Sequence, residues 1–412
     1  MNSLDCMVVI GTRPEAVKMV PVFRALQATP DLIRPTLVLT GQHHEIVHEV
    51  LGLFDVHAHV DLGLMQHGQT LSDFTARALT ALTTLFARAR PDVVLVQGDT
   101  TTVFAASLAA FYQQIPVGHV EAGLRSHDKR QPFPEEMNRR LTGTLADIHF
   151  APTQSALDNL LHERVPAARI FVTGNPVIDA LLLIKDRAVT RALAQFPFLA
   201  NGKRTLLVTS HRRENHGAPL SDICAAVRQL VERYGDLQVV WSVHPNPAVA
   251  AVVHRELQAA PRVHLVPPIA YCAFVGVMAL AHIILSDSGG VQEEAPALGK
   301  PVLVLRDTTE RPEAVLAGTA KVIGTATRTI VTEAARLFED PARYRAMTTA
   351  VSPYGDGHAA QRIRDALCFY FGLRQHAPDP FVGLPLSHTG PTEKTRSDPD
   401  LLLGTPLQAQ PG

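Results

Sequence analysis

The sequence predicts an α/β fold built from two doubly wound domains that face each other across a cleft. Short β-branched runs alternate with helical stretches along most of the chain. The predicted strands are almost continuously apolar, which is typical of parallel sheets covered by helices on both faces. These strands are too many for a single sheet, so we divide them between two sheets.

In the first half, strands are expected at residues 7–10, 36–39, 93–97, 117–120 and 148–151; in the second, at 205–209, 238–243, 263–266, 283–285, 301–305 and 321–323. We place the join near Gly174-Asn175-Pro176, with one domain at residues 1–175 and the other at 176–373. Residues 374–412 are rich in proline, glycine and small polar residues, and we expect a disordered tail there.

Composition excludes several classes of protein. The 412 residues carry a formal net charge of -1, with Lys+Arg 38 against Asp+Glu 39, which gives no basic field for nucleic acid. No signal peptide and no apolar run of membrane-spanning length is recognised, so no membrane partner is expected. The four cysteines are scattered without CxxC spacing, which predicts a reduced cytoplasmic protein without a cysteine metal site.

The most informative segment begins at Ile283. A buried strand leads into the glycine-bearing turn Ser286–Gly290, and residues 292–298 are expected to form a helix. A turn that opens a helix offers free backbone N–H groups and the positive end of the helix dipole, which suits a phosphate. Glu293 and Glu294 are candidates for binding ribose hydroxyls, and Arg311 is a candidate partner for a phosphate. An ordinary βαβ turn would read the same way.

Polar residues recur where predicted strands end. A single such residue is readily explained as a helix cap or a structural ion pair. Five on predicted cleft edges favour a site, because ligands of doubly wound sheets bind at the carboxyl ends of the strands. These residues are Arg13 with Lys18, Asp99, Glu121, His211 and His244.

The segment Pro132–Arg140 adds a further acid, Glu135, at the start of a predicted helix. No GxSxG, GxxxxGK[ST] or HExxH motif occurs, and no GxGxxG follows the first strand, so nicotinamide binding is not expected. The histidines at 43–44, 57 and 59 lack a nearby carboxylate set, and we interpret them as surface residues rather than metal ligands. We therefore expect no metal and no cofactor.

Nine strings in order resemble one family: GTRPE, QGDT, HVEAGLRS, PFPEEMNRR, TGNPVID, HRREN, HPNP, DSGGVQEEAPALGKPVLVLRDTTERPEA and PYGDG. From about Met7 to about Leu373 the chain resembles the non-hydrolysing UDP-N-acetylglucosamine 2-epimerases. The resemblance implies two Rossmann-like domains in the GT-B arrangement, with a UDP-sugar in the cleft and a last helix that crosses back to the first domain. It also implies a homodimer.

The resemblance implies roles for individual residues. The catalytic positions would be Asp99, Glu121, Glu135 and His211. The positions that hold UDP would be Arg13, Lys18, Phe274, Ser288, Gly289, Gly290, Glu294 and Arg311; for Phe274, simple core packing explains the residue as well. A second, activating UDP-sugar site would involve Gln42, Gln69, Glu136, Arg212 and His244.

The expected reaction is the reversible interconversion of UDP-GlcNAc and UDP-ManNAc for surface polysaccharides. The proton at C2 of the sugar is not acidic. Without a nicotinamide to oxidise C3, the practical route eliminates UDP and then adds it back. Four alternatives stay open: a 2-epimerase of a modified UDP-sugar such as a diacetamido uronic acid, a hydrolysing epimerase that releases ManNAc, a GT-B glycosyltransferase, and a non-catalytic UDP-sugar sensor.

Overall fold

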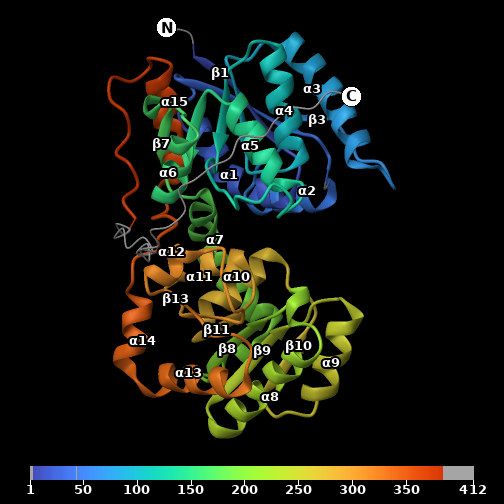
Figure 1. Cartoon of the computed structure of the whole chain (residues 1–412), viewed down its shortest axis with the longest axis vertical. Helices are drawn as coiled ribbons and strands as arrows, with labels where there is room; N and C mark the ends of the chain where they lie inside the picture. Colours follow the sequence, from blue (N-terminus) through green and yellow to red (C-terminus); the bar gives the residue numbers. More distant parts are fainter. Residues whose placement is uncertain (1–2, 43, 384–412) are drawn as a thin grey trace, which may run out of the picture.

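The computed structural model describes residues 3–42 and 44–383, which form two sheet units stacked end to end (Figure 1). The first unit contains a seven-stranded sheet in the order β3-β2-β1-β4-β5-β6-β7. All its pairings are parallel. Its strands are β1 Leu4–Ile10, β2 Ile33–Leu39, β3 Val60–Asp61, β4 Val93–Gln97, β5 Val117–Val120, β6 Ile148–Ala151 and β7 Ile170–Val172.

The second unit contains a six-stranded sheet in the order β10-β9-β8-β11-β12-β13, again parallel throughout. Its strands are β8 Arg204–Thr209, β9 Leu237–Ser242, β10 Val263–Val266, β11 Ile283–Ser286, β12 Val302–Val304 and β13 Ala320–Val322. The prediction of two doubly wound sheets is confirmed. The two strands missed from sequence, β3 and β7, are short edge strands of two and three residues.

Helices cover both faces of each sheet, which explains the near-continuous apolar strands. Val8, Val9 and Ile10 of β1 are all fully buried although successive side chains point to opposite faces. The helices of the first unit are α1 Arg13–Gln27, α2 His44–Leu53, α3 Leu71–Ala89, α4 Thr101–Tyr112, α5 Glu135–Leu145 and α6 Gln154–His162. Those that follow are α7 Pro176–Gln195, α8 Ala218–Arg233, α9 Pro247–Leu257, α10 Tyr271–Leu280, α11 Gly289–Ala297, α12 Pro312–Leu316, α13 Thr327–Glu339, α14 Pro341–Thr348 and α15 Ala359–Tyr370.

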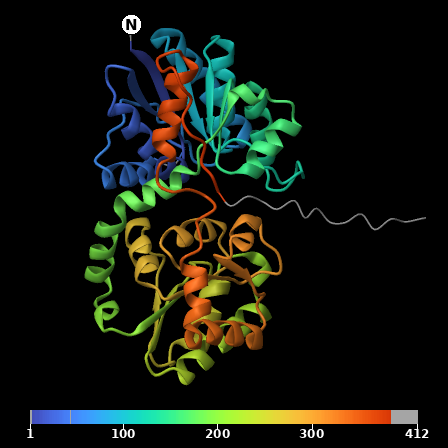
Figure 2. The same ribbon diagram turned by 90° about the vertical axis from the view of Figure 1, so that its left-hand side faces the viewer.

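Two helices tie the units together. Helix α7 joins the sheets and packs against both α1 of the first unit and α10 of the second, as Figure 2 shows. Helix α15 returns from the second unit to pack on α1. Its start is held by Asp179 of α7, whose carboxylate accepts from the backbone N–H groups of Ala359 and Ala360 at 3.2 and 2.8 Å.

The expected disorder from residue 374 onward does not hold for residues 374–383. Phe381 is 6% exposed, and its backbone N–H donates to the Val172 carbonyl at 2.8 Å. Its ring also lies 5.7 Å from the Arg362 guanidinium. One buried aromatic side chain therefore anchors this proline-rich segment beside the first sheet. Residues 384–412 of the predicted tail lie outside the described residues.

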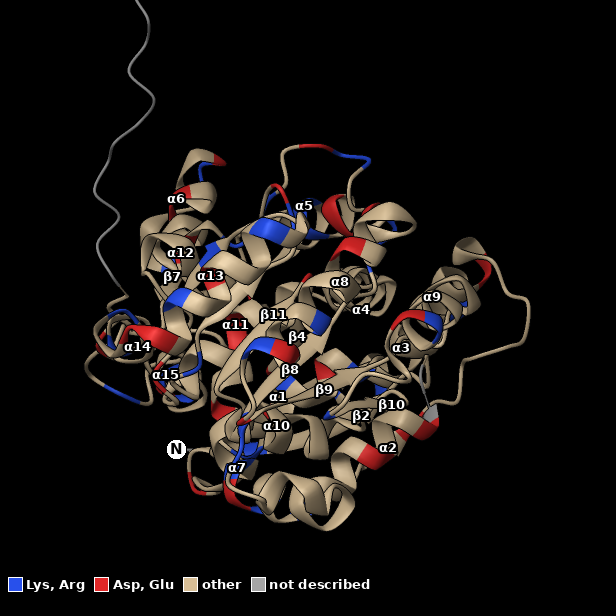
Figure 3. Ribbon diagram, turned by 90° about the horizontal axis from the view of Figure 1, so that it is seen from below, with Lys and Arg blue, Asp and Glu red and all other residues tan. Residues whose placement is uncertain are grey.

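Charges are interspersed over the molecule. Basic and acidic residues are both scattered over the two units in the view of Figure 3, which agrees with the net charge of -1. In the described part of the chain, no helix is both long and apolar enough to cross a membrane.

Candidate active site in the cleft

A cavity of ≈ 410 Å³ opens at the carboxyl ends of the first sheet. Its lining includes the three carboxylates Asp99, Glu121 and Glu135 together with Lys18, and the second unit contributes Arg311. The structure thus brings these five predicted residues together. They come from segments that lie far apart in the chain, and they meet because parallel strands end at one edge of the sheet.

Glu121 is held as a charged carboxylate. It accepts a hydrogen bond from Lys18 Nζ at 2.6 Å, one from Asn175 Nδ2 at 2.9 Å and one from the Gln97 amide. Burial alone would raise the pKa of Glu121, but the attraction and hydrogen bond of the Lys18 ammonium, together with Arg311 and Asn175, outweigh burial and lower it. Glu121 also has a φ of 62°, in the left-handed region that non-glycine residues seldom occupy.

The other two carboxylates are held differently. Asp99 Oδ2 accepts from Arg139 Nε at 2.9 Å, and its backbone carbonyl accepts from Asn138 Nδ2 at 2.9 Å. Glu135 is the first residue of α5, and its Oε2 atom is shielded from solvent without a hydrogen-bond partner. This oxygen of Glu135 is therefore not engaged by another group of the described chain.

A fourth carboxylate in this cavity, Glu15, links two loops of the first sheet. Its oxygens accept from the Gly11 backbone N–H and from Thr100 Oγ1, each at 2.5 Å. Thr100 directly follows Asp99, so Glu15 fixes the turn that presents Asp99. Gly11 must be glycine here, since an added Cβ would lie 2.1 Å from Thr102 Oγ1. Desolvation raises the pKa of Glu15 to about 7.

The predicted phosphate seat lies at the start of α11. This helix begins at Gly289, three residues earlier than expected, so both glycines belong to its first turn rather than to the preceding turn. The Ser288 side chain does not cap the helix, which leaves the first N–H groups available. A Cβ added to Gly289 would lie 3.9 Å from the Arg311 guanidinium, so a cation stands beside these N–H groups.

Glu293 and Glu294 have separate surroundings, although both were expected to bind ribose. Glu293 is buried and forms an ion pair with Arg311 Nε. Attraction from Glu293 raises the pKa of Arg311 further above its usual value. Desolvation, reinforced by the neighbouring charge of Glu293, raises the pKa of Glu294 to about 8. In this arrangement Glu293 orients Arg311, and Glu294 alone is left for a neutral donor.

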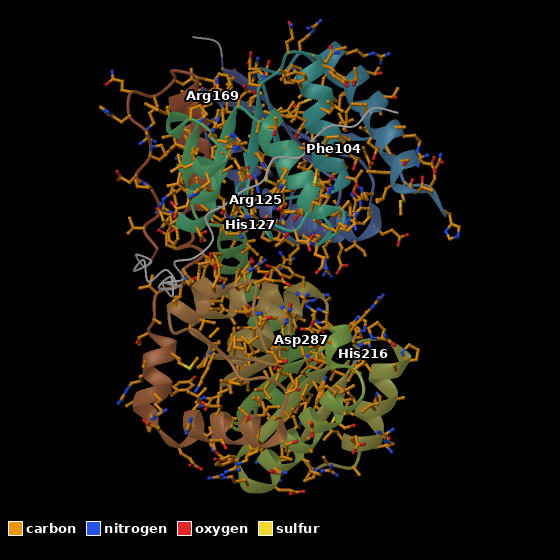
Figure 4. The ribbon with its side chains drawn as sticks, viewed as in Figure 1. Phe104, Arg125, His127, Arg169, His216 and Asp287 are labelled. Atoms are coloured by element: carbon orange, nitrogen blue, oxygen red, sulfur yellow. The ribbon has the colours of Figure 1, made fainter. Side chains whose placement is uncertain are left out.

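His211 is positioned by a residue that the sequence analysis missed. Asp287 is fully buried and accepts from the backbone N–H groups of His211 and Arg212 at 2.9 and 3.0 Å. It also accepts from Ser210 Oγ and Asn215 Nδ2, each at 2.9 Å. Figure 4 shows Asp287 on the side of the second unit that faces the first, with Arg125 and His127 on the opposing side.

The side chain of His211 is held by the same carboxylate. Its Nδ1 lies 3.0 Å from Asp287 Oδ1. Because a carboxylate only accepts, this contact assigns the hydrogen to Nδ1 and leaves Nε2 for a ligand. Burial opposes the charge of Asp287, but the hydrogen bond from His211 and the backbone donors lower its pKa to about 2.

The remaining predicted residues do not form one site. Arg13 lines a different cavity, beside Tyr271. Phe274 is partly buried and packs on the apolar core, as the simpler explanation predicts. Gln42 lines the cavity of the three carboxylates, while the rings of His211 and His244 lie 6.1 Å apart.

Two further residues predicted for the activating site make local contacts. Glu136 is fully buried and holds Arg139 and Arg140 at 3.3 Å each, so in this arrangement its carboxylate is structural. Gln69 accepts from the Gln66 backbone N–H at 3.1 Å and from Arg77. Sequence carries no signal that separates these structural partners from ligands.

Comparison with known proteins gives a consistent picture. The family model described as UDP-N-acetylglucosamine 2-epimerase matches residues 24–368. The UDP-N-acetylglucosamine 2-epimerase of Bacillus subtilis (strain 168) is 49% identical over 384 residues, which cover 93% of this chain and 100% of the relative. That of Escherichia coli (strain K12) is 50% identical over 370 residues, covering 88% and 98%.

Solved structures agree with these matches. The UDP-GlcNAc 2-epimerase of Neisseria meningitidis bound to UDP-GlcNAc is 46% identical with a TM-score of 0.79, and the match covers 88% of this chain and 99% of that one. The enzyme of Methanocaldococcus jannaschii is 31% identical with a TM-score of 0.79, covering 89% and 100%.

Proposed function

The chain belongs to the UDP-N-acetylglucosamine 2-epimerase family, and from this premise we propose that it interconverts UDP-GlcNAc and UDP-ManNAc. One observation carries the proposal: three carboxylates share a cavity with Lys18 and Arg311, and that cavity draws on both units. A protein that only bound a UDP-sugar would need the cations but would have little use for three acids.

The first half of the reaction breaks two bonds of the sugar nucleotide. A carboxylate removes the C2 proton, the C1–O bond breaks with its electron pair going to UDP, and a double bond forms between C1 and C2. The product is an unsaturated 2-acetamidoglucal. Lys18, Arg311 and the free N–H groups of α11 stabilise the charge that develops on the diphosphate. Nε2 of His211 is available as a further donor to this anion.

The second half reverses these steps on the other face of C2. UDP adds back to C1 while an acid delivers a proton to C2 from the opposite side, so atoms and charges balance without a redox partner. Two groups on opposite faces of the ring are needed. Glu135, with one unpartnered oxygen, and Asp99 or Glu121 are the groups that the cavity offers.

Deuterium incorporation tests the proposal directly. The protein is incubated with UDP-GlcNAc in D₂O without added cofactor, and the products are followed by NMR. UDP-ManNAc with deuterium at C2 is expected. Product with protium retained at C2 would rule out exchange at these carboxylates, and free ManNAc with UDP would identify a hydrolysing enzyme. If UDP-GlcNAc is not turned over but a modified UDP-sugar is, the protein is a 2-epimerase of the modified sugar.

We also propose that an activating UDP-sugar binds between Gln42 on the first unit and Arg212 and His244 on the second. Arg212 is loosely held, with its Nη2 3.7 Å from Glu310 Oε2, and its Nε has no hydrogen-bond partner in the part of the chain that the structure describes. Arg212 directly follows His211 in the chain, and the ring of His244 lies 6.1 Å from the ring of His211. Sigmoidal dependence of the rate on UDP-GlcNAc, abolished in Arg212→Ala, would support this second site.

Two properties of the protein in the cell are part of the proposal. We infer a homodimer formed through α4, because Phe111 and Tyr112 are 57% and 59% exposed and Phe104 and Leu108 continue the same helix face. Phe111→Asp is expected to give monomers in sedimentation velocity. We place the reaction in the cytoplasm, since all four cysteines are free and buried.

A further inference from the structure

A separate cavity of ≈ 260 Å³ lies where α1, α2, α7 and α10 meet. Among the described residues, its lining shares no member with the cavity of the three carboxylates. One wall belongs to the first unit, one to α10 of the second, and one to α7, the helix that joins them. A ligand here would therefore touch both units at their junction.

The charged side chains that line this cavity are mainly positive. Arg13, Arg187 and Arg191 line it, against the single carboxylate of Glu49. Arg187 Nη1 donates to the Leu53 carbonyl at 2.8 Å. In the described part of the chain none of the three guanidinium groups has an ion pair, although most other arginines near the cleft do. An arginine fork without a carboxylate partner is suited to bind an oxyanion.

Two further polar groups lie at the α10 wall. The Tyr271 hydroxyl is shielded from solvent and has no hydrogen-bond partner among the described residues, which is costly for a buried polar group. Burial raises the pKa of the adjacent Cys272 thiol, and the positive charges of Arg191 and Arg187 oppose that rise. Both guanidinium groups therefore act on the same wall as the unsatisfied hydroxyl.

We propose that this cavity binds a small phosphate-bearing anion, with Arg187, Arg191 and Arg13 around the oxygens and the Tyr271 hydroxyl as a further donor. Arginine and tyrosine supply only donors to a tetrahedral oxyanion, and the net charge of the lining favours a negative ligand. The volume is below the ~300 Å³ at which pockets for drug-sized ligands begin, so the ligand is a phosphate group with at most a small substituent.

The position of the cavity gives the ligand a conformational role. Arg13 belongs to the first unit, while Tyr271 belongs to the second and the other two arginines to α7. An anion that contacts all of them favours the arrangement in which they converge, by its differential affinity for that arrangement. The inference does not depend on the reaction catalysed in the main cleft.

Calorimetry with inorganic phosphate and with glycerol 3-phosphate tests the site, at constant ionic strength set with NaCl. Titrations are run with and without saturating UDP, which occupies the proposed diphosphate seat. Binding is expected in both conditions. Arg187→Gln/Arg191→Gln is expected to weaken it at least ~10-fold, the loss of two charge-assisted contacts. UDP affinity should be unchanged, because neither residue belongs to the proposed UDP site.

A matched control removes the same charge elsewhere. Arg328→Gln/Arg345→Gln lies on exposed positions of α13 and α14 and should leave phosphate binding unchanged. Tyr271→Phe deletes only the hydroxyl and should weaken binding several-fold without loss of folding. Equal phosphate affinity in wild type and Arg187→Gln/Arg191→Gln, or phosphate binding that saturating UDP abolishes, would overturn the proposal. Failure of UDP itself to bind would instead count against the proposed function.

Discussion

The most informative substitution is Asp287→Asn, because it keeps the shape of a buried residue and removes its charge. Asp287 accepts from Ser210, His211, Arg212 and Asn215, all at about 3 Å. An asparagine presents an NH₂ group to at least one of these donors, which leaves buried donors unsatisfied. The change therefore acts on the stability of the second unit and on the orientation of His211.

The magnitude follows from the pKa of Asp287, which is lowered from 3.8 to about 2. One pKa unit corresponds to ~1.4 kcal/mol, so the folded state favours the charged carboxylate by roughly 2 kcal/mol. Because the folded-state pKa is the lower one, this contribution is complete above about pH 4. It is lost as the pH falls from about 4 toward 2. Asp287→Asn is expected to lower the free energy of unfolding by about 2 to 4 kcal/mol at pH 7.

Urea unfolding at pH 7 and pH 3 measures this effect, with Asp222→Asn, an exposed acid of the same unit, as the control. The difference between wild type and Asp287→Asn should shrink at pH 3, while Asp222→Asn stays close to wild type at pH 7. We also expect kcat to fall ~10-fold or more, because His211 loses the partner of its Nδ1. Wild-type stability together with wild-type kcat would refute this account of His211.

Three further predictions test the site and the fold. Asp99→Asn, Glu121→Gln and His211→Asn should each lower kcat by at least ~10²-fold in folded protein; near-normal turnover in all three would contradict the assignment. Lys18→Met should reduce kcat at least as much as Glu121→Gln and move the acid limb of the pH–rate profile upward, because Glu121 loses the cation that lowers its pKa; an unmoved limb would argue against the pair. Phe381→Ala should cost ~3 kcal/mol of stability, whereas Val382→Ala, at a position 77% exposed, should cost little; equal effects would show that the Phe381 contact is unimportant.

Much of the fold could be predicted because parallel sheets leave a strong pattern in sequence. The central strands β4, β5 and β6 have the predicted bounds, since an apolar run flanked by polar residues identifies a strand that is buried on both faces. The edge strand β3 has only two residues, which are too few to show a repeating pattern of apolar and polar residues. Phe381 is a lone aromatic residue in a proline-rich segment, and it packs beside Val172 and Gly174, which lie far away in the sequence.

The acids of the candidate site could be predicted from the sequence, but most of the residues that position the site could not. Asp99, Glu121 and Glu135 follow strands or open a helix, where local sequence indicates exposure to the cleft. Asp287 receives its donors from residues 72 to 77 positions away in the chain, so no local pattern reveals its role. Adjacent residues such as Glu293 and Glu294 point in different directions on a helix, and only the position of Arg311 decides which of them forms the ion pair.

We propose that, with Glu121 as the base at C2, Lys18 couples the departure of UDP to the removal of the C2 proton. Its ammonium lies 2.6 Å from Glu121 and also faces the cavity that contains Arg311. Burial lowers the pKa of Lys18, but attraction to Glu121, Glu293 and Asp99, together with the hydrogen bond to Glu121, outweighs burial and raises that pKa. As negative charge develops on the departing diphosphate, Lys18 is drawn toward it, and Glu121 loses part of the attraction that keeps its own pKa low. Glu121 then becomes a stronger base at the stage when the C2 proton must leave. One cation thus links the departure of UDP to proton transfer without any change of redox state.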